Sequence, residues 1–321
     1  MKKLFLLTLF LIAFLLCSGM VFAGGEQEES GKVTVGTSVF STEIEYFYIL
    51  SEAYKTAGES RGIEVFATDG ENNVDKQIQI IEDFIVKGVD GIVISAINPN
   101  AERAILEEAM DSGIPVLLQG QERVEADWAT ANIGYSEWDM GYMAGELAAD
   151  RINELYGDKE SVKVAILGFP QWPSCIRRAD AHIQALKDNV KGPEINVVAR
   201  QEGGTRQNAL KVIETALQAH PDLRCVVSIN DDGAIGAVAA FEAAGVDVLK
   251  ECCIAGCNND RAVRPYIREG KILGSVDLNH QGLADDAMDA ILALKRGEEI
   301  PEMLYVKMNK VTPDNIDQFD W

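Results

Sequence analysis

The sequence predicts an α/β protein made of two doubly wound parallel-sheet domains. Short runs of aliphatic and β-branched residues alternate with helical stretches, which is the pattern of a parallel sheet covered on both faces. These runs fall into two sets, one before residue 120 and one from residue 162 onward. The 321 residues, of which 47% are hydrophobic, are enough to build two separate cores.

In the first set, each expected strand is a short apolar run that a polar turn ends. We expect helices between these strands, and glycines follow two of them, Gly88 and Gly113. A glycine is favoured where a helix stops in a left-handed residue before the next strand begins. The strands are expected at residues 33–37, 63–67, 91–95 and 114–118, and helices at 77–86 and 101–110.

The second set repeats this order, so the chain resembles one doubly wound unit used twice. Gly245 again follows an expected helix and precedes an apolar run. We expect strands at residues 162–167, 195–199, 225–229, 253–257 and 272–276, with helices near 176–186, 208–219 and 234–244.

The N-terminal residues have the form of a secretory signal peptide. Two lysines precede an apolar run over residues 4–16, and Ala23 ends a small-residue cleavage pattern. We therefore expect residues 1–23 to be removed, residues 24–32 to form a flexible tether, and the mature protein to be periplasmic or otherwise extracytoplasmic. Cys17 is a candidate lipid acceptor, but the bulky leucine before it disfavours that processing.

Charge and cysteine content narrow the function further. With 51 acidic and 29 basic residues, the net charge is −22. Nucleic acid is therefore not expected as a partner, and the protein is expected to be a soluble monomer.

The five cysteines beyond the signal segment lack zinc-site spacing and are expected to be buried as small hydrophobic residues. The alternative is a disulfide from Cys225 to Cys252 or Cys253 across neighbouring strands.

Polar and aromatic side chains gather where the expected strands end. In doubly wound folds, ligands bind outside the carboxyl ends of the strands, so these residues are expected to face one site. Amides, carboxylates, an arginine and aromatic rings suit a neutral polyhydroxyl ligand, because rings cover its CH face while the polar groups meet its hydroxyls. The candidates are Tyr46, Phe47, Gln121, Trp172, Arg178, Asn230, Asn258 and Asp277.

The order and spacing of several motifs resemble the periplasmic sugar-binding proteins of the ribose/galactose class, the type I solute-binding components of ABC importers. The motifs include Thr37-Ser38 with Tyr46-Phe47, Asp69-Gly-Glu-Asn-Asn73, Ser95-Ala-Ile-Asn-Pro99, Gly113-Ile-Pro-Val116 and Asn230-Asp231 before a small-residue helix. The resemblance covers nearly the whole mature chain. It implies no catalysis and, as partners, a membrane permease with its cytoplasmic ATPase.

The resemblance also implies a hinge of three crossovers, near Tyr135, Leu278 and Tyr305. One lobe would then contain residues 31–135 and 279–305, and the other residues 136–278 and 306–321. Closure of the lobes over a ligand is the expected motion.

Residue by residue, the resemblance implies that Tyr46 and Phe47 sandwich a sugar ring. Arg178, with Arg177 as the fallback, would bind hydroxyls, and Asn230, Asn258 and Asp277 would do the same. The pattern departs from the family at Gly120-Gln121, where an Asp-Arg pair is usual, at Gly203-Gly204 and at Leu278. These changes argue against assigning ribose as the ligand, since hydroxyl-reading sites reject analogues strongly. Trp172 is expected to contact the ligand or the hinge, with ordinary packing as the alternative.

Each residue of the run Asn230-Asp231-Asp232 has its own expected role. We expect Asn230 to contact the ligand, Asp231 to cap the following helix or support the site, and Asp232 to be solvated. The spacing of a calcium loop is missing, and the chain has no Gly-x-Gly-x-x-Gly fingerprint, so neither metal nor cofactor is expected.

Three rival functions remain. The same closed form could signal to a chemoreceptor or sensor kinase instead of a permease. A transcriptional regulator is disfavoured by the signal segment and by the lack of a helix-turn-helix before residue 33. A secreted carbohydrate enzyme would need a carboxylate pair such as Asp231 and Asp277; the sequence has no Gly-x-Ser-x-Gly elbow and no His-x-x-x-His pair.

Overall fold

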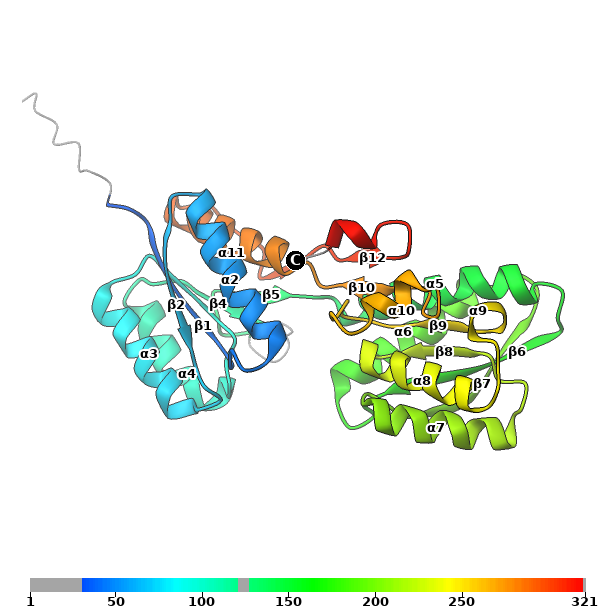
Figure 1. Ribbon diagram of the computed structural model, residues 1–321. Coiled ribbons are helices and arrows are strands. Elements are labelled where there is room, and N and C mark those ends of the chain that lie inside the picture. The colour runs from blue at the N-terminus through cyan, green and yellow to red at the C-terminus, as the bar shows by residue number, and fades with distance from the viewer. Residues whose placement is uncertain (1–30, 121–126, 320–321) are drawn as a thin grey trace, which may run out of the picture.

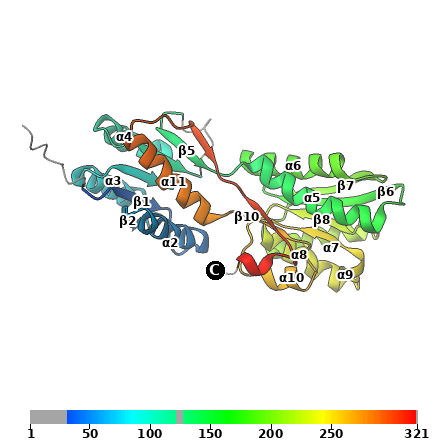
Figure 2. The same ribbon diagram turned by 90° about the horizontal axis from the view of Figure 1, so that it is seen from above.

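The computed structural model describes residues 31–120 and 127–319, which fold into two lobes lying end to end (Figure 1). The expected signal peptide, the start of the tether, Cys17 and Gln121 lie outside these residues. Each lobe has a parallel sheet between two layers of helices (Figures 1 and 2). The predicted doubly wound α/β fold is confirmed.

The first lobe is built on six parallel strands. They are β1 (Thr34–Val39), β2 (Glu64–Asp69), β3 (Gly91–Ile94), β4 (Val116–Gln119), β5 (Ala131–Gly134) and β11 (Met303–Tyr305). Their order across the sheet is β11-β5-β4-β3-β1-β2, so the last strand in sequence lies beside β5. Helices α3 (Val74–Lys87) and α4 (Pro99–Asp111) pack together on one face, while α2 (Glu45–Ser60) and α11 (His280–Lys295) cover the other (Figure 1).

The second lobe repeats this plan with four parallel strands in the order β7-β6-β8-β9. They are β6 (Ser161–Gly168), β7 (Glu194–Glu202), β8 (Cys225–Ser228) and β9 (Cys253–Ala255). Helices α5 (Glu137–Tyr156) and α6 (Pro173–Asn189) lie on one face, and α7 (Arg206–Ala219) and α8 (Asp231–Ala243) on the other (Figure 2). Short elements complete the lobe: α9 (Val248–Glu251), α10 (Arg264–Arg268), η2 (Ile316–Phe319) and the antiparallel pair β10 (Ser275–Asp277) and β12 (Asn309–Val311).

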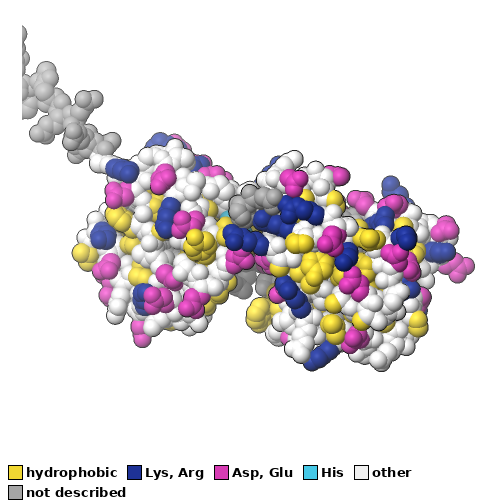
Figure 3. Space-filling model, in the orientation of Figure 1, with side chains coloured by type: hydrophobic (Ala, Val, Ile, Leu, Met, Phe, Trp, Pro, Cys, Tyr) yellow, Lys and Arg dark blue, Asp and Glu magenta, His cyan; other side chains and the backbone are white. Residues whose placement is uncertain are grey.

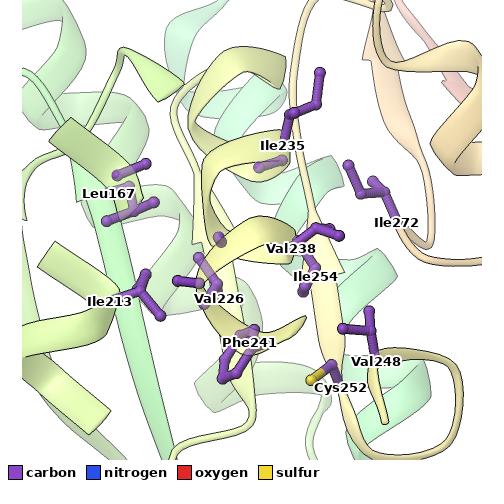
Figure 4. Packing of buried hydrophobic residues seen from close by; sticks show 14 of the residues in the cluster. Leu167, Ile213, Val226, Ile235, Val238, Phe241, Val248, Cys252, Ile254 and Ile272 are labelled. Carbon is purple, nitrogen blue, oxygen red and sulfur yellow. The ribbon is translucent and has the colours of Figure 1, made fainter. Parts of the chain in front are cut away.

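Alternation along the strands supplies apolar residues to both helix layers. In β8, Cys225 and Val227 join the cluster beneath α5 and α6, whereas Val226 joins the cluster beneath α7 and α8. Figure 4 shows the latter cluster, in which Phe241 of α8 lies next to Val226. All five cysteines of the described residues are buried free thiols, so the disulfide alternative is not seen, although Cys225 and Cys253 are register partners.

Within the described residues the chain passes from one lobe to the other three times, after β5, after β10 and after β11. Asn279 stands at the second passage in a left-handed conformation with φ 51°. Its Oδ1 accepts from Gly282 N at 3.1 Å, which caps α11, and its Nδ2 donates to the Lys307 carbonyl at 3.0 Å. One side chain therefore fastens the second passage to the third.

Local signals in the sequence account for most element ends. Gly88 ends α3 with φ 64°, and Gly113 and Gly245 also have positive φ, as predicted. Strand β4 begins after Pro115, later than expected, since proline has no N–H for the ladder. The prediction lacked α5, whose apolar face consists largely of alanine and glycine and gives a weak periodic signal.

Those small residues let α5 and α6 approach closely. A Cβ at Gly141 would overlap the carbonyl oxygen of Arg178, and a Cβ at Gly145 would meet the His182 carbonyl oxygen at 2.7 Å. Because Gly141 has no side chain, α6 can lie close to α5, and this close packing determines where Arg178 is held.

Replacing Gly141 with alanine should destabilise the protein by about 1–3 kcal/mol, because the added methyl group must push two closely packed helices apart. Urea unfolding followed by circular dichroism measures this change. Asp150→Ala, an exposed position on the same helix, serves as the control and should change stability by less than about 0.5 kcal/mol. Equal stability of Gly141→Ala and the wild type would contradict the packing argument.

Candidate ligand-binding cleft

A cleft of about 700 Å³ lies between the lobes and is lined by residues from both. Its volume is within the range usual for small-molecule sites. The lining comes from segments that follow β1, β3 and β4 in the first lobe and β6, β8 and β9 in the second. The carboxyl ends of both sheets thus meet at one place, as the fold class requires.

The first lobe contributes an aromatic wall. The rings of Tyr46 and Phe47 meet edge to face at 4.9 Å, and Phe47 stacks on Phe40 at 5.6 Å. The Tyr46 hydroxyl accepts a hydrogen bond from Gln119 Nε2 at 2.9 Å, and burial raises the pKa of this phenol to about 12. Tyr46 is thus held as a neutral ring, and both predicted aromatic residues line the cleft.

The second lobe offers a matching aromatic surface. Trp172 precedes α6 and is 55% exposed, which is unusual for so large an apolar side chain. Its ring stacks on Phe169 with the centroids 5.2 Å apart, and both residues line the cleft. Trp172 therefore faces the cleft and is not part of the core.

Arg178 lies at the base of the second-lobe wall and is firmly held. Its Nε and Nη2 both lie 2.6 Å from Glu137 Oε2, and its Nη1 donates to the Ile229 carbonyl at 2.8 Å. Burial disfavours the guanidinium charge, but Glu137 outweighs that effect and raises the pKa of Arg178. These contacts use three of the five N–H groups that a guanidinium offers.

The run from Asn230 to Asp232 is arranged differently from the prediction. Asn230 itself caps α8, because its Oδ1 accepts from Gly233 N at 3.0 Å, while its Nδ2 donates to the Gly204 carbonyl at 2.8 Å. The expected capping role of Asp231 is therefore wrong, and its alternative role of supporting the site fits. Asn230 still lines the cleft.

Asp231 is buried and anchors the loop that carries Asn258. Its Oδ1 accepts from Ser275 Oγ at 2.7 Å and its Oδ2 from Asp260 N at 2.8 Å. Burial, and then the charge of Asp260, raise the pKa of Asp231 well above its usual value. The anchored loop includes two successive residues of positive φ, Asn258 at 103° and Asn259 at 58°, and places Asn258 in the cleft lining.

Asp277 differs from its predicted role as a ligand contact. It is 1% exposed and is absent from the cleft lining. Its Oδ1 accepts from Asn259 Nδ2 at 3.1 Å and its Oδ2 from Asn279 N at 2.9 Å. Asp277 therefore joins the cleft loop to the second passage between the lobes.

Of the other predicted contacts, Gln121 lies outside the described residues. The lining also contains polar side chains outside the predicted set of ligand contacts: Glu45, Gln119, Glu137, Asp260, Arg261, Arg264 and His280. Gln119, Asp260 and His280 belong to polar runs at strand ends, which was the available signal. Glu137 carried no signal, because α5 was not predicted.

Comparison with known proteins agrees with this geometry. Residues 35–299 match the family described as the periplasmic binding protein domain. The chain belongs to the periplasmic binding protein family.

Its similarity to individual binding proteins extends over most of the chain. It is 29% identical over 302 residues to the ribose import binding protein of Bacillus subtilis (strain 168), covering 91% of this chain and 93% of that protein. It is 25% identical over 294 residues to the galactofuranose-binding protein of Escherichia coli (strain K12), covering 90% and 91%.

Solved structures of ABC transporter solute-binding proteins share the fold. One from Actinobacillus succinogenes 130z with bound D-allose has a TM-score of 0.72 at 23% identity, covering 89% of this chain and 100% of that chain. One from Bacillus halodurans C-125 with bound myo-inositol has a TM-score of 0.70 at 23% identity, covering 91% and 98%. At these identities the likeness shows the fold alone.

An ion pair joins the two lobes of this binding protein at the cleft. Arg261 Nε of the second lobe lies 3.0 Å from Glu45 Oε1 of α2. Both side chains are half exposed, so the pair contributes about 0–1 kcal/mol. Lys and Arg side chains gather near the junction on the face seen in Figure 3, while acidic residues are spread over both lobes.

Metal-binding clusters and membrane-spanning helices are both absent from residues 31–120 and 127–319. No group of three or more His, Cys, Asp and Glu side chains there is arranged to hold a metal ion. Nor is any helix among them both long enough and apolar enough to cross a membrane.

The carboxyl group of Asp260 is the most perturbed acid of the cleft lining. Burial, followed by the charges of Asp232 and Glu45, raises the pKa of Asp260 to about 6. Its folded pKa lies above the ordinary value of 3.8, so the stabilisation from its protonated form is complete below that value. It is lost as the pH rises through about 6.

Asp232→Asn should lower the pKa of Asp260, since it removes one of the two negative charges that raise it. The side-chain carbonyl resonance of Asp260, followed by ¹³C NMR across pH 3 to 8, measures the midpoint. Asp150→Asn, which removes an exposed charge on α5, is the control and should leave the midpoint unchanged. An unshifted midpoint in Asp232→Asn would show that the charge of Asp232 does not act on Asp260.

Proposed function

We propose that this protein captures a sugar or sugar-like polyol between its lobes and delivers it to an ABC importer. The observation that carries the proposal is the composition of the cleft, where aromatic rings from both lobes accompany amide, carboxylate and guanidinium groups. Rings cover the CH faces of a sugar while polar groups meet its hydroxyls. The names and titles of similar proteins mention ribose, galactofuranose, D-allose and myo-inositol, and these compounds support the same class of ligand.

Within this proposal, Tyr46 and Phe47 cover one face of the ligand and Trp172 approaches from the second lobe. Arg178, Asn230 and Asn258 hydrogen-bond its hydroxyls. Glu137 already neutralises Arg178, which therefore suits an uncharged hydroxyl better than an anion. Asp277 acts indirectly, by holding Asn259 and the loop beside it.

The lobes are proposed to move as units about the three passages between the sheets. One unit comprises residues 31–135 with 279–305, and the other residues 136–278 with 306–321. A ligand that touches both walls of the cleft binds the closed form better than the open form, and so shifts the population toward closure. The permease would then recognise the surfaces that closure brings together.

The proposed location is extracytoplasmic, as for the periplasmic relatives. Export by a signal peptide over residues 1–23 belongs to the proposal, because these residues lie outside the described part of the chain. A monomer that meets a permease with its cytoplasmic ATPase is the expected partner arrangement.

The rival functions have less support. A sensory role would use the same closed form, and the comparisons do not favour it over import. The family and the relatives are binding proteins. Asp231 and Asp277, the carboxylates that a carbohydrate hydrolase would use, are both buried, absent from the cleft lining and hydrogen-bonded to protein groups.

A panel of sugars, polyols, nucleosides and amino acids should separate these possibilities in a thermal-shift assay. A sugar or polyol at 100 times its dissociation constant should stabilise residues 24–321 by about 2.7 kcal/mol. With about 2.1 cal/mol/K of unfolding entropy per residue, that corresponds to a rise in melting temperature of roughly 4–5 °C for a protein of this size. A response only to nucleosides or amino acids would overturn the ligand class while leaving the fold.

Arg178→Lys should weaken binding of that ligand about tenfold or more while the protein remains folded. Lysine keeps a positive charge opposite Glu137 but lacks the planar fork of donors. Isothermal titration calorimetry gives the affinity, and Arg177→Lys, one residue away and exposed, is the matched control that should bind normally. An equal loss of affinity in both variants would show that Arg178 makes no specific contact with the ligand.

A further inference from the structure

His280 is a buried polar side chain of the cleft that has no partner. It opens α11 directly after the second passage between the lobes, and its ring lines the cleft. The residue is 7% exposed, and among the described residues neither Nδ1 nor Nε2 has a hydrogen-bond partner. Buried polar atoms of folded proteins are nearly always hydrogen-bonded, so two unpaired atoms on one ring require an explanation.

Two polar side chains that are close to His280 in space or in sequence, Tyr46 and Asp277, are engaged elsewhere. The ring of Tyr46 packs on it with the centroids 4.8 Å apart, but the Tyr46 hydroxyl bonds to Gln119. The carboxylate of Asp277 accepts from Asn259 and Asn279. Leu278, between Asp277 and the cap residue, is apolar. The cleft is the side from which a partner can still arrive.

A second buried histidine shows what ordinary packing provides. His182 lies between α5 and α6, is fully buried, and has its Nδ1 2.7 Å from the Gly141 carbonyl, while its Nε2 has no partner among the described residues. It lies outside the cleft lining. In His280, neither ring nitrogen has such a contact among the described residues.

We propose that His280 forms hydrogen bonds with hydroxyl groups of the bound polyol in the closed form of the protein. This inference rests on the proposed function and narrows it. Burial lowers the pKa of His280 to about 4, so near neutral pH its ring is uncharged and offers one N–H donor and one acceptor nitrogen.

Such a ring matches hydroxyls, which both donate and accept, whereas an ionised carboxylate has no donor for the acceptor nitrogen of the ring. His280 thereby selects a neutral polyol with a free hydroxyl on the side that faces the second passage. His280 thus has the role of binding ligand hydroxyls that the sequence analysis predicted for Asp277.

The test is His280→Phe, which keeps an aromatic ring and removes both nitrogens. Whichever of D-ribose, D-allose, D-galactose or myo-inositol stabilises the wild type serves as the probe. Its affinity for His280→Phe should fall about tenfold or more. The melting temperature of the unliganded variant should stay equal or rise, because two unpaired buried polar atoms are gone. A purely structural histidine would give the opposite pair of results.

His182→Leu is the matched control, since it removes another buried ring that makes a contact with the protein. It should lower the melting temperature of the unliganded protein and leave the affinity within about twofold. Monodeoxy forms of the probe add a second readout. One of them should bind the wild type less well than the parent compound, with that difference absent in His280→Phe.

The wild type provides a test that does not depend on the folding of a variant. The ¹⁵N resonances of the His280 ring should change on addition of the probe, with one tautomer becoming fixed. Unchanged resonances, or equal affinity of wild type and His280→Phe, would overturn the inference and leave the proposed function standing. If no sugar or polyol bound the wild type, the proposed function and the inference would both fall.

Discussion

The buried carboxyl group of Asp231 is the interaction on which the second-lobe side of the cleft depends. It holds Ser275 and the backbone of Asp260, and Ser275 Oγ in turn accepts from Asn259 N at 2.9 Å. Asn259 continues to Asp277, whose other oxygen binds the first residue of the passage to α11. A single buried acid thus joins a loop of the cleft to the second passage between the lobes. Removing a member of such a network leaves its partners unsatisfied away from water, which costs more than one ordinary hydrogen bond.

The fold could be predicted from the sequence because its signals are local. Apolar runs, helix-ending glycines and their repetition in two sets depend on near neighbours in the chain. The site was harder, because the direction of a polar side chain at a strand end depends on a shift of one or two residues. Asn230 caps α8 where Asp231 was expected to, and Asp277 turns inward while His280 reaches the cleft around the left-handed Asn279. The pairing of β10 with β12, residues distant in sequence, sets that turn.

Charge is distributed so that an acidic protein presents a balanced cleft. The net charge is −22, yet the carboxylates of Glu45 and Glu137 in the lining lie against Arg261 and Arg178 respectively. A neutral ligand entering this cleft meets groups whose charges are already compensated, so its hydroxyls replace water without leaving an ion unpaired. The surface outside the cleft carries the excess acid and keeps the protein soluble.

The threading of the chain between the sheets also determines when the first lobe can form. Strand β11 is the edge strand beside β5 in its six-stranded sheet, and α11 covers the apolar face beside α2. Residues 280–305 are therefore needed to complete a core that begins at residue 33. Contacts this distant in sequence form late, since the intervening chain must first be brought together. During synthesis, the N-terminal third therefore emerges long before its partners and remains without a finished core until almost the whole protein has been made.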